Sequence, residues 1–152
     1  MTIKVGDKLP SVTITEATAD GPKPVTTDAF FAVPGAFTPT CSAKHVPGFK
    51  EHAGDLKAKG VDEIVCLSVN DAFVMKAWGE NQGVMGTILM LADPAGDFTK
   101  AAGLEMDASK FGLGLRSQRY SMIVEDGVVK ELNVEAPGEF KVSAADYMLA
   151  QL

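Results

Sequence analysis

The segment Pro34-Gly35-Ala36-Phe37-Thr38-Pro39-Thr40-Cys41 constrains this chain more than any other part of its sequence. The apolar stretch from Phe30 to Val33 leads into it and is predicted to form a β-strand. Apolar residues at helical spacing follow it, from Val46 to Leu56. The segment is therefore predicted to be a proline-braced loop that places one cysteine at the start of a helix.

Cys41 is thus expected in the first turn of a helix, where unpaired backbone N–H groups and the helix dipole favour an anion. Such a position favours the thiolate, which is the nucleophilic form of cysteine. Thr38 lies three residues upstream, within reach of whatever the sulfur holds. A lone cysteine is more often a buried, inert thiol. The pattern Pro-x-x-x-Thr-x-x-Cys leading into a helix instead favours a reactive one.

The composition of the chain excludes several classes of protein. The chain has 152 residues, of which 46% are hydrophobic, as expected for a single domain spanning 1–152. A net charge of −6 argues against nucleic acid and an anionic membrane surface as partners. No apolar run approaches the ~20 residues of a membrane span, and the first residues lack a signal-peptide core.

The few metal-binding side chains lead to a similar expectation. The two cysteines and two histidines lack the spacing of a zinc site, so we expect neither a metal nor another cofactor. Two cysteines are too few to indicate a fold that is held together by disulfides. Free cysteines are typical of proteins in a reducing compartment, so we expect the protein in the cytoplasm.

Predicted strands alternate with predicted helices along the chain. The expected strands are Val12–Thr15, Glu63–Val69, Thr87–Ala92 and a hairpin of Tyr120–Val124 with Val128–Val134 around Asp126-Gly127. The expected helices are Cys41–Gly60 with a kink at Pro47, Ala72–Glu80 capped by Asn70 and Asp71, Asp97–Ala102, and Ser143–Leu152 capped by Ser143. This order predicts an α/β fold with a mixed sheet.

Four segments resemble one protein family, and together they cover nearly the whole chain. Pro34, Thr38 and Cys41 resemble the active-site motif of the peroxiredoxins. The stretches that resemble the type-five subgroup of that family are Pro34–Phe49, Cys66–Trp78, Leu91–Leu104 and Gly112–Glu135. The resemblance implies a thioredoxin-like fold, a thiol peroxidase that reduces hydrogen peroxide and organic hydroperoxides, and a homodimer.

The resemblance also implies roles for individual residues. Cys41 would be the nucleophile, which peroxide converts to a sulfenic acid. Thr38 would bond the thiolate and the peroxide, and Pro34 would shield the sulfur from water. Arg119 matches the catalytic arginine of the subgroup. The supporting positions are Gly35, Arg116 and His45. From the residues alone, Arg119 and Arg116 cannot be told apart.

The second cysteine bears on how the enzyme is recycled. Cys66 lies in an apolar strand and is expected to be buried and inert. Some relatives carry a resolving cysteine near the C-terminus, where this chain has none. The resemblance therefore implies a one-cysteine enzyme whose sulfenic acid is reduced by glutathione, glutaredoxin or both. Two alternatives stay open: a redox sensor or adaptor without turnover, and a thiol hydrolase that uses Cys41 with His45.

One stretch departs from the family pattern. Relatives carry a helix, a basic turn and a hydrophobic strand between the equivalents of Val25 and Pro34, which are only nine positions apart here. A strand alone needs about 5–6 residues, so the helix and turn do not fit as well. We therefore expect that a loop has been omitted and that the chain is interrupted between Asp28 and Phe31. A truncated strand there would disturb the loop that holds Cys41.

Overall fold

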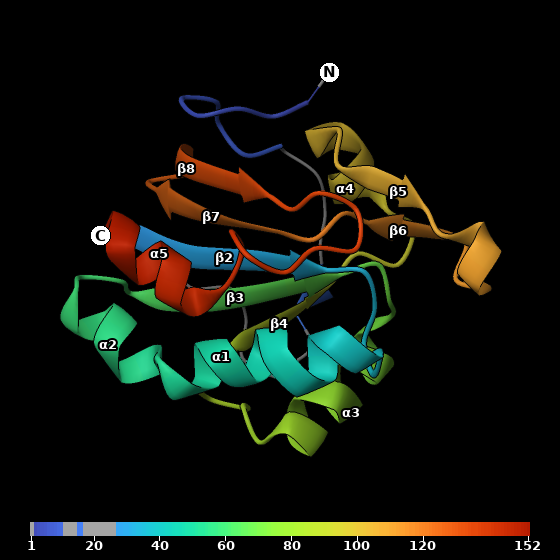
Figure 1. Cartoon of the computed structure of the whole chain (residues 1–152), viewed down its shortest axis with the longest axis horizontal. Helices are drawn as coiled ribbons and strands as arrows, with labels where there is room; N and C mark the ends of the chain where they lie inside the picture. The colour runs from blue at the N-terminus through green and yellow to red at the C-terminus, as the bar shows by residue number, and fades with distance from the viewer. Residues whose placement is uncertain (1, 11–14, 17–26) are drawn as a thin grey trace.

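The computed structural model describes residues 2–10, 15–16 and 27–152, and a six-stranded sheet lies at its centre (Figure 1). Its strands, in the order β1-β4-β3-β2-β7-β8 across the sheet, are β1 (Thr15–Glu16), β4 (Leu89–Ala92), β3 (Glu63–Ser68), β2 (Thr27–Val33), β7 (Tyr120–Glu125) and β8 (Val128–Val134). Strands β2, β3 and β4 are parallel, whereas β1, β7 and β8 pair antiparallel. The predicted mixed α/β sheet is confirmed.

Helices cover both faces of this sheet. One face packs against α1 (Val46–Glu51), α2 (Ala53–Ala58), α3 (Ala72–Gln82) and α5 (Ala145–Gln151), and the other packs against α4 (Asp97–Ala102) (Figure 1). Successive side chains of a strand point to opposite faces. In β2, Phe31 accordingly joins the core under α1, while Phe30 joins the core under α4. Both residues are buried, so the strand that leads to Cys41 is fixed from both sides.

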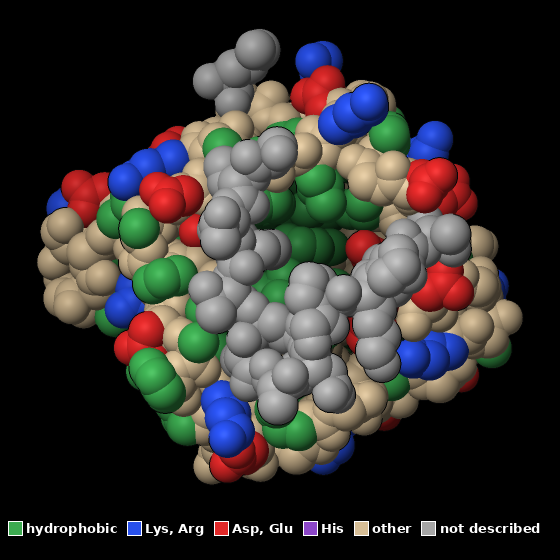
Figure 2. All heavy atoms as spheres, turned by 180° about the vertical axis from the view of Figure 1, so that it is seen from behind, with side chains coloured by type: hydrophobic (Ala, Val, Ile, Leu, Met, Phe, Trp, Pro, Cys, Tyr) green, Lys and Arg blue, Asp and Glu red, His purple; other side chains and the backbone are tan. Residues whose placement is uncertain are grey.

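A small ribbon stands beside the main sheet. It consists of β5 (Glu105–Asp107) and β6 (Leu115–Ser117), which pair antiparallel around the short 3-10 helix η2 (Ser109–Phe111). Seen from behind Figure 1, the surface shows hydrophobic side chains near its middle, and charged side chains of both signs lie toward its edges (Figure 2). None of the described helices has the length and apolarity needed to cross a bilayer.

Strand β2 corrects one expectation. It pairs with β3 without a gap, from Asp28 opposite Glu63 to Val33 opposite Ser68, and it pairs with β7 as well. The interruption expected between Asp28 and Phe31 is therefore wrong, and the central strand is complete at seven residues. The first part of the shortened stretch, including Val25, lies outside the described residues.

Most local predictions of secondary structure are confirmed. Asp71 caps α3 through a hydrogen bond that Val74 N–H donates to its side chain (2.8 Å). The β7–β8 hairpin turns at Asp126 and Gly127, whose φ angles of 52° and 77° match the positive values that such a two-residue turn requires. Of the strand expected from Val12 to Thr15, only Thr15 lies within the described residues.

Two helix predictions need correction. The C-terminal helix α5 begins at Ala145, and Ser143 does not cap it, because its hydroxyl donates to Glu135 instead. The helix after Cys41 is not continuous to Gly60. It begins as a π-helical turn, η1 (Cys41–His45), and His52 separates α1 from α2.

Candidate active site

The loop after β2 is anchored by its neighbour β3. Ala36 N–H donates to Asn70 Oδ1 (3.0 Å), and the hydroxyl of Ser68 donates to the same oxygen (2.6 Å). Asn70, expected only as a helix cap, thus holds the loop that carries the cysteine. Phe37 at the tip has a φ of 62°, which is uncommon for a residue other than glycine. The loop is therefore held in a defined, locally strained shape.

Gly35 permits a close approach of two side chains. A Cβ atom at this position would lie 3.0 Å from Thr38 Cγ2 and 3.1 Å from Arg116 Nη1. Both distances are tighter than ordinary contacts of a Cβ atom, so a larger residue here would displace Thr38 or Arg116. Arg116 is fixed in this place by its own Nε, which donates to the carbonyl of Leu113 (3.0 Å).

Cys41 opens the π-helical turn rather than a regular α-helix. The turn closes with a bond from Val46 N–H to the Cys41 carbonyl, five residues back. Pro47 follows at once and has no N–H to give to the carbonyl of Ala43, so the predicted distortion at this proline takes the form of a widened turn just before it. Such single π turns occur frequently at functional sites. Trp78 Nε1 donates to the hydroxyl of Ser42 (3.0 Å) and secures the turn from α3.

Arg119 lies against the sulfur of Cys41. Its Nη2 donates to Cys41 Sγ (3.2 Å) and its Nη1 donates to His45 Nδ1 (2.9 Å). The guanidinium carbon lies 5.8 Å from the centre of the Phe140 ring. Among the ion pairs of the described residues, none involves Arg119. Its positive charge is therefore available to the sulfur and to groups that enter the site.

His45 is neutral and buried behind this arginine. Its Nε2 donates to the carbonyl of Ser143 (2.9 Å), and its Nδ1 accepts from Arg119, because a guanidinium and a carbonyl fix the direction of both bonds. Burial, together with the nearby charge of Arg119, lowers the pKa of His45 to about 3. Since Arg119 occupies its lone pair, His45 is not placed to take a proton from Cys41. The geometry does not favour the hydrolase alternative.

The hydroxyl of Thr38 donates to the carbonyl of Gly35 (2.6 Å). A threonine hydroxyl has one proton to give, so the bond that we expected from Thr38 to the thiolate is replaced by a bond that closes the loop. Its oxygen keeps lone pairs that can accept a hydrogen bond from a ligand.

A cavity of about 860 Å³ lies beside these residues, and its walls are mostly apolar. It is lined by Pro34, Thr38, Pro39, Thr40, Glu105, Met106, Ala108, Phe111, Leu113, Gln118, Arg119, Glu135, Ala136, Pro137, Gly138 and Glu139. Pro34, Thr38 and Arg119 thus share one cavity, whereas Arg116 does not line it. The loops after β2, β6 and β8 meet there.

The second cysteine has the buried position that was predicted. Cys66 lies in β3 opposite Phe31 of β2, is fully buried, and forms no disulfide with Cys41. Burial raises the pKa of the Cys66 thiol, and the neighbouring Cys41 raises it further despite an opposing effect of Arg119. Cys66 is therefore held as an unreactive thiol.

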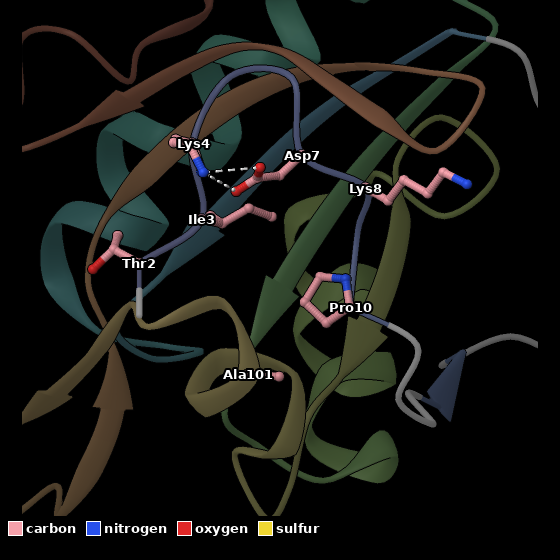
Figure 3. A pocket seen from close by; sticks show the side chains of 7 residues that line it. All are labelled: Thr2, Ile3, Lys4, Asp7, Lys8, Pro10 and Ala101. Atoms are coloured by element: carbon pink, nitrogen blue, oxygen red, sulfur yellow. Dashed lines mark hydrogen bonds and ion pairs between the residues drawn. The ribbon is translucent and has the colours of Figure 1, made fainter.

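A second depression, of about 370 Å³, lies near the N-terminus and lacks comparable chemistry (Figure 3). Its lining is Thr2, Ile3, Lys4, Asp7, Lys8, Pro10 and Ala101. Figure 3 shows the amine of Lys4 turned onto the carboxylate of Asp7, at 3.2 Å. In the part of the chain that the structure describes, no cluster of three or more histidine, cysteine or acidic side chains could hold a metal ion.

Comparisons with known proteins agree with the geometry at Cys41. The Redoxin family model matches residues 4–149. The chloroplastic Peroxiredoxin-2E-2 of Oryza sativa subsp. japonica is 52% identical over 99% of this chain and 73% of its own length. The chain belongs to the peroxiredoxin family of thiol peroxidases. Its alignment with the rice relative spans 164 positions, more than the 152 residues here, so this peroxiredoxin lacks some segments that the relative has.

Solved structures agree on the fold and the subgroup. Reduced Prx3 of Vibrio vulnificus in complex with hydrogen peroxide is 55% identical, with a TM-score of 0.93 over 99% of this chain and 100% of that one. Peroxiredoxin 5 of Alvinella pompejana is 34% identical, with a TM-score of 0.84 over 97% and 96%. The fold is thioredoxin-like, and this peroxiredoxin belongs to the type II subgroup that resembles type five.

Proposed function

We propose that this peroxiredoxin reduces hydrogen peroxide and organic hydroperoxides at Cys41, with Thr38, Arg119 and Pro34 completing the catalytic site. The observation that carries the proposal is the hydrogen bond from Arg119 Nη2 to Cys41 Sγ (3.2 Å) beside an open cavity. A charge-assisted donor to sulfur favours the thiolate and stabilises charge that develops next to it.

The chemistry needs one bond to form as another breaks. The Cys41 thiolate attacks one peroxide oxygen, the S–O bond forms, and the O–O bond breaks. The leaving oxygen takes a proton and departs as water or an alcohol, which leaves a sulfenic acid. Arg119 stabilises negative charge first on the sulfur and then on the leaving oxygen. The free lone pairs of Thr38 accept the peroxide O–H, and Pro34 keeps bulk water from the sulfur.

The supporting residues hold this arrangement in place. Neutral His45 accepts from Arg119 and orients the guanidinium without sharing or cancelling its charge. Gly35 leaves room for Thr38 and Arg116 to pack against the backbone of the loop, and Arg116 braces the loop. The apolar walls of the cavity suit the hydrocarbon part of an organic hydroperoxide.

The sulfenic acid is then reduced by a thiol from outside the chain. Burial raises the pKa of the Cys66 thiol in β3, which keeps it protonated and a poor nucleophile, so we propose glutathione as the first reductant. Glutathione and the sulfenic acid would form a mixed disulfide and water. A second thiol, for which glutaredoxin is the natural agent, would release Cys41.

Two measurements test this proposal. Peroxide consumption in large excess over enzyme distinguishes a peroxidase from a sensor, which is oxidised once. Intact-mass analysis after one equivalent of peroxide plus glutathione should show one glutathione on Cys41 and none on Cys66, and turnover should follow glutaredoxin more strongly than thioredoxin. A Cys41–Cys66 disulfide as the main product, with full turnover on thioredoxin, would contradict the assigned reductant.

The state of the protein in solution is part of the same proposal. We propose that the chain acts as one domain within a homodimer, as the family resemblance implies, and that it works in the cytoplasm. A reducing compartment keeps both cysteines as free thiols. Sedimentation equilibrium tests the dimer, and fractionation of cells that express the protein tests the compartment.

A further inference from the structure

The guanidinium of Arg119 depends on a loop that is remote from Cys41 in sequence. This loop, residues 136–144, follows Glu135 at the end of β8 and leads to α5. Its Ser143 carbonyl accepts from His45 Nε2 (2.9 Å), and its Phe140 ring lies 5.1 Å from the His45 ring, edge to face. Since His45 in turn accepts from Arg119, any shift of the loop moves the partner that orients the arginine.

Glu135 holds this loop in its shape. Its Oε2 accepts from Lys141 N–H (2.7 Å), Ser143 N–H (2.8 Å) and the Ser143 hydroxyl (2.6 Å). Its own backbone N–H donates to the carbonyl of Arg119 (2.9 Å). Glu135 therefore contacts both ends of the arrangement, the backbone of the arginine and the loop that positions His45.

These bonds place three donors on one oxygen of the Glu135 carboxylate. The residue is only 6% exposed, and a buried carboxylate is costly unless donors compensate it. Burial acts to raise the pKa of Glu135, but hydrogen bonds from Ser143 and Lys141 outweigh it and hold the pKa below its usual value. Glu135 and Arg119 line the same cavity without forming an ion pair. The carboxylate thus does not neutralise the arginine that the sulfur requires.

We propose that Glu135 is a positioning residue for peroxide reduction: by clamping Lys141 and Ser143 it fixes His45, and through His45 it holds Arg119 against Cys41. Ser143 is the link in this relay, since its carbonyl binds His45 while its N–H and hydroxyl bind Glu135. The consequence for catalysis rests on the proposed peroxidase function, whereas the relay itself concerns the resting enzyme.

Single-turnover kinetics test the catalytic consequence. We expect Glu135→Ala to slow oxidation of Cys41 by hydrogen peroxide about 10- to 100-fold, as displaced catalytic groups do. Glu135→Gln keeps an oxygen that accepts the same donors, so it should stay within about threefold of the unmodified enzyme. If Glu135→Ala does not fold, Ser143→Ala removes one of the three donors and should give a smaller loss in the same direction.

Asp93 supplies a matched control. It is also buried, at 1% exposed, and its carboxylate also accepts two backbone N–H bonds and one hydroxyl bond, from Phe98 and Thr99. These two residues lie in the first turn of α4, on the other face of the sheet. Asp93→Ala should lower the melting temperature as Glu135→Ala does but leave the oxidation rate unchanged at a temperature where both are folded. Equal rate losses in the two variants would overturn the proposal.

A second readout does not need turnover. The chain has two histidines, His45 and His52, so their imidazole ¹⁵N resonances are readily assigned. His45 should remain neutral with its proton on Nε2 down to about pH 5 in the unmodified protein and in Glu135→Gln. In Glu135→Ala it should titrate at higher pH, while His52 serves as the reference. An unaltered His45 in Glu135→Ala would overturn the proposal, whereas an inactive unmodified enzyme would overturn only the proposed function.

Discussion

Arg119 Nη2 lies 3.2 Å from Cys41 Sγ although 78 residues separate them along the chain. The sheet brings them together. Strands β2 and β7 are antiparallel neighbours, and Ala32 near the end of β2 lies opposite Tyr120 at the start of β7. The residue before Tyr120 therefore projects beside the loop that follows β2. The strand pairing, more than any local motif, creates the contact between Cys41 and Arg119.

The two cysteines should differ in their effect on activity. Cys41→Ser should abolish peroxide consumption, because serine cannot provide the thiolate nucleophile. Cys66→Ser should retain most activity, because burial raises the pKa of the Cys66 thiol, whereas Cys41 accepts the hydrogen bond of Arg119. Steady-state assays of both variants with glutathione and glutaredoxin check this, and comparable losses would show that Cys66 takes part in recycling.

Arg119 and Arg116 should differ in their effect on the rate of Cys41 oxidation. Arg119→Ala removes the donor to Cys41 Sγ and should slow oxidation of the thiol by about 10²–10³-fold, as loss of a preorganised charge-stabilising donor often does. Arg116→Ala should cost less, because Arg116 braces the loop against Gly35 and Leu113 without contacting the sulfur. Stopped-flow oxidation with hydrogen peroxide measures both, and the same rate for Arg119→Ala as for the unmodified enzyme would remove it from the site.

Gly35→Ala should distort the loop that carries the cysteine. The added methyl group would lie 3.0 Å from Thr38 Cγ2 and 3.1 Å from Arg116 Nη1. We expect a lower oxidation rate and a lower melting temperature. Gly48→Ala is the control, because a Cβ there meets nothing within 4 Å. If pairing Gly35→Ala with Arg116→Ala recovers none of the loss, the crowding with Arg116 is not its cause.

His45 should make the folded state sensitive to acid. Its folded pKa of about 3 lies below the ordinary value of 6.5, mainly because it is buried. The unfolded chain therefore binds the proton more readily, and the contribution of His45 to stability is present above about pH 6.5 and is lost as the pH falls toward 3. Thermal unfolding between about pH 7 and about pH 4.5 should show a smaller decline for His45→Asn than for the unmodified protein. Equal declines would contradict this assignment.

Signals between near neighbours explain why most of the fold could be predicted. Asp126-Gly127 specifies its turn, and Asp71 specifies the start of α3, because each acts within a few residues. Ser143 shows the limit of such reasoning. Its sequence position suits a helix cap, but a carboxylate eight residues away, Glu135, takes its hydroxyl. Tertiary contacts of this kind override a local preference.

The candidate site also contains residues that the local sequence predicts and residues that it does not. Cys41 and Thr38 stand out because the loop and helix around them have a recognisable pattern. Arg116 and Arg119 do not, because residues three apart in an extended chain point to opposite sides, and nothing local says which side faces the cysteine. Glu135 is harder still to predict, since its role depends on a loop whose Ser143 contacts His45, 98 residues away in the sequence.

Asp28 should give the opposite pH dependence to His45. Burial, followed by the charges of Glu63 and Asp62, raises the pKa of Asp28 from 3.8 to about 6. The folded state therefore binds this proton more tightly than the unfolded chain, so the stability that it contributes is present at low pH and is lost as the pH rises from about 3.8 through 6. In the described part of the chain its buried Oδ1 has no hydrogen-bond partner.

Asp28→Asn removes the charge at nearly constant shape, so the melting temperature of this variant should exceed that of the unmodified protein above about pH 6 and converge with it near pH 4. Glu63→Gln, which removes the second contribution, should shift stability in the same direction by less. A difference between Asp28→Asn and the unmodified protein that is the same at both pH values would show that Asp28 does not titrate in this range.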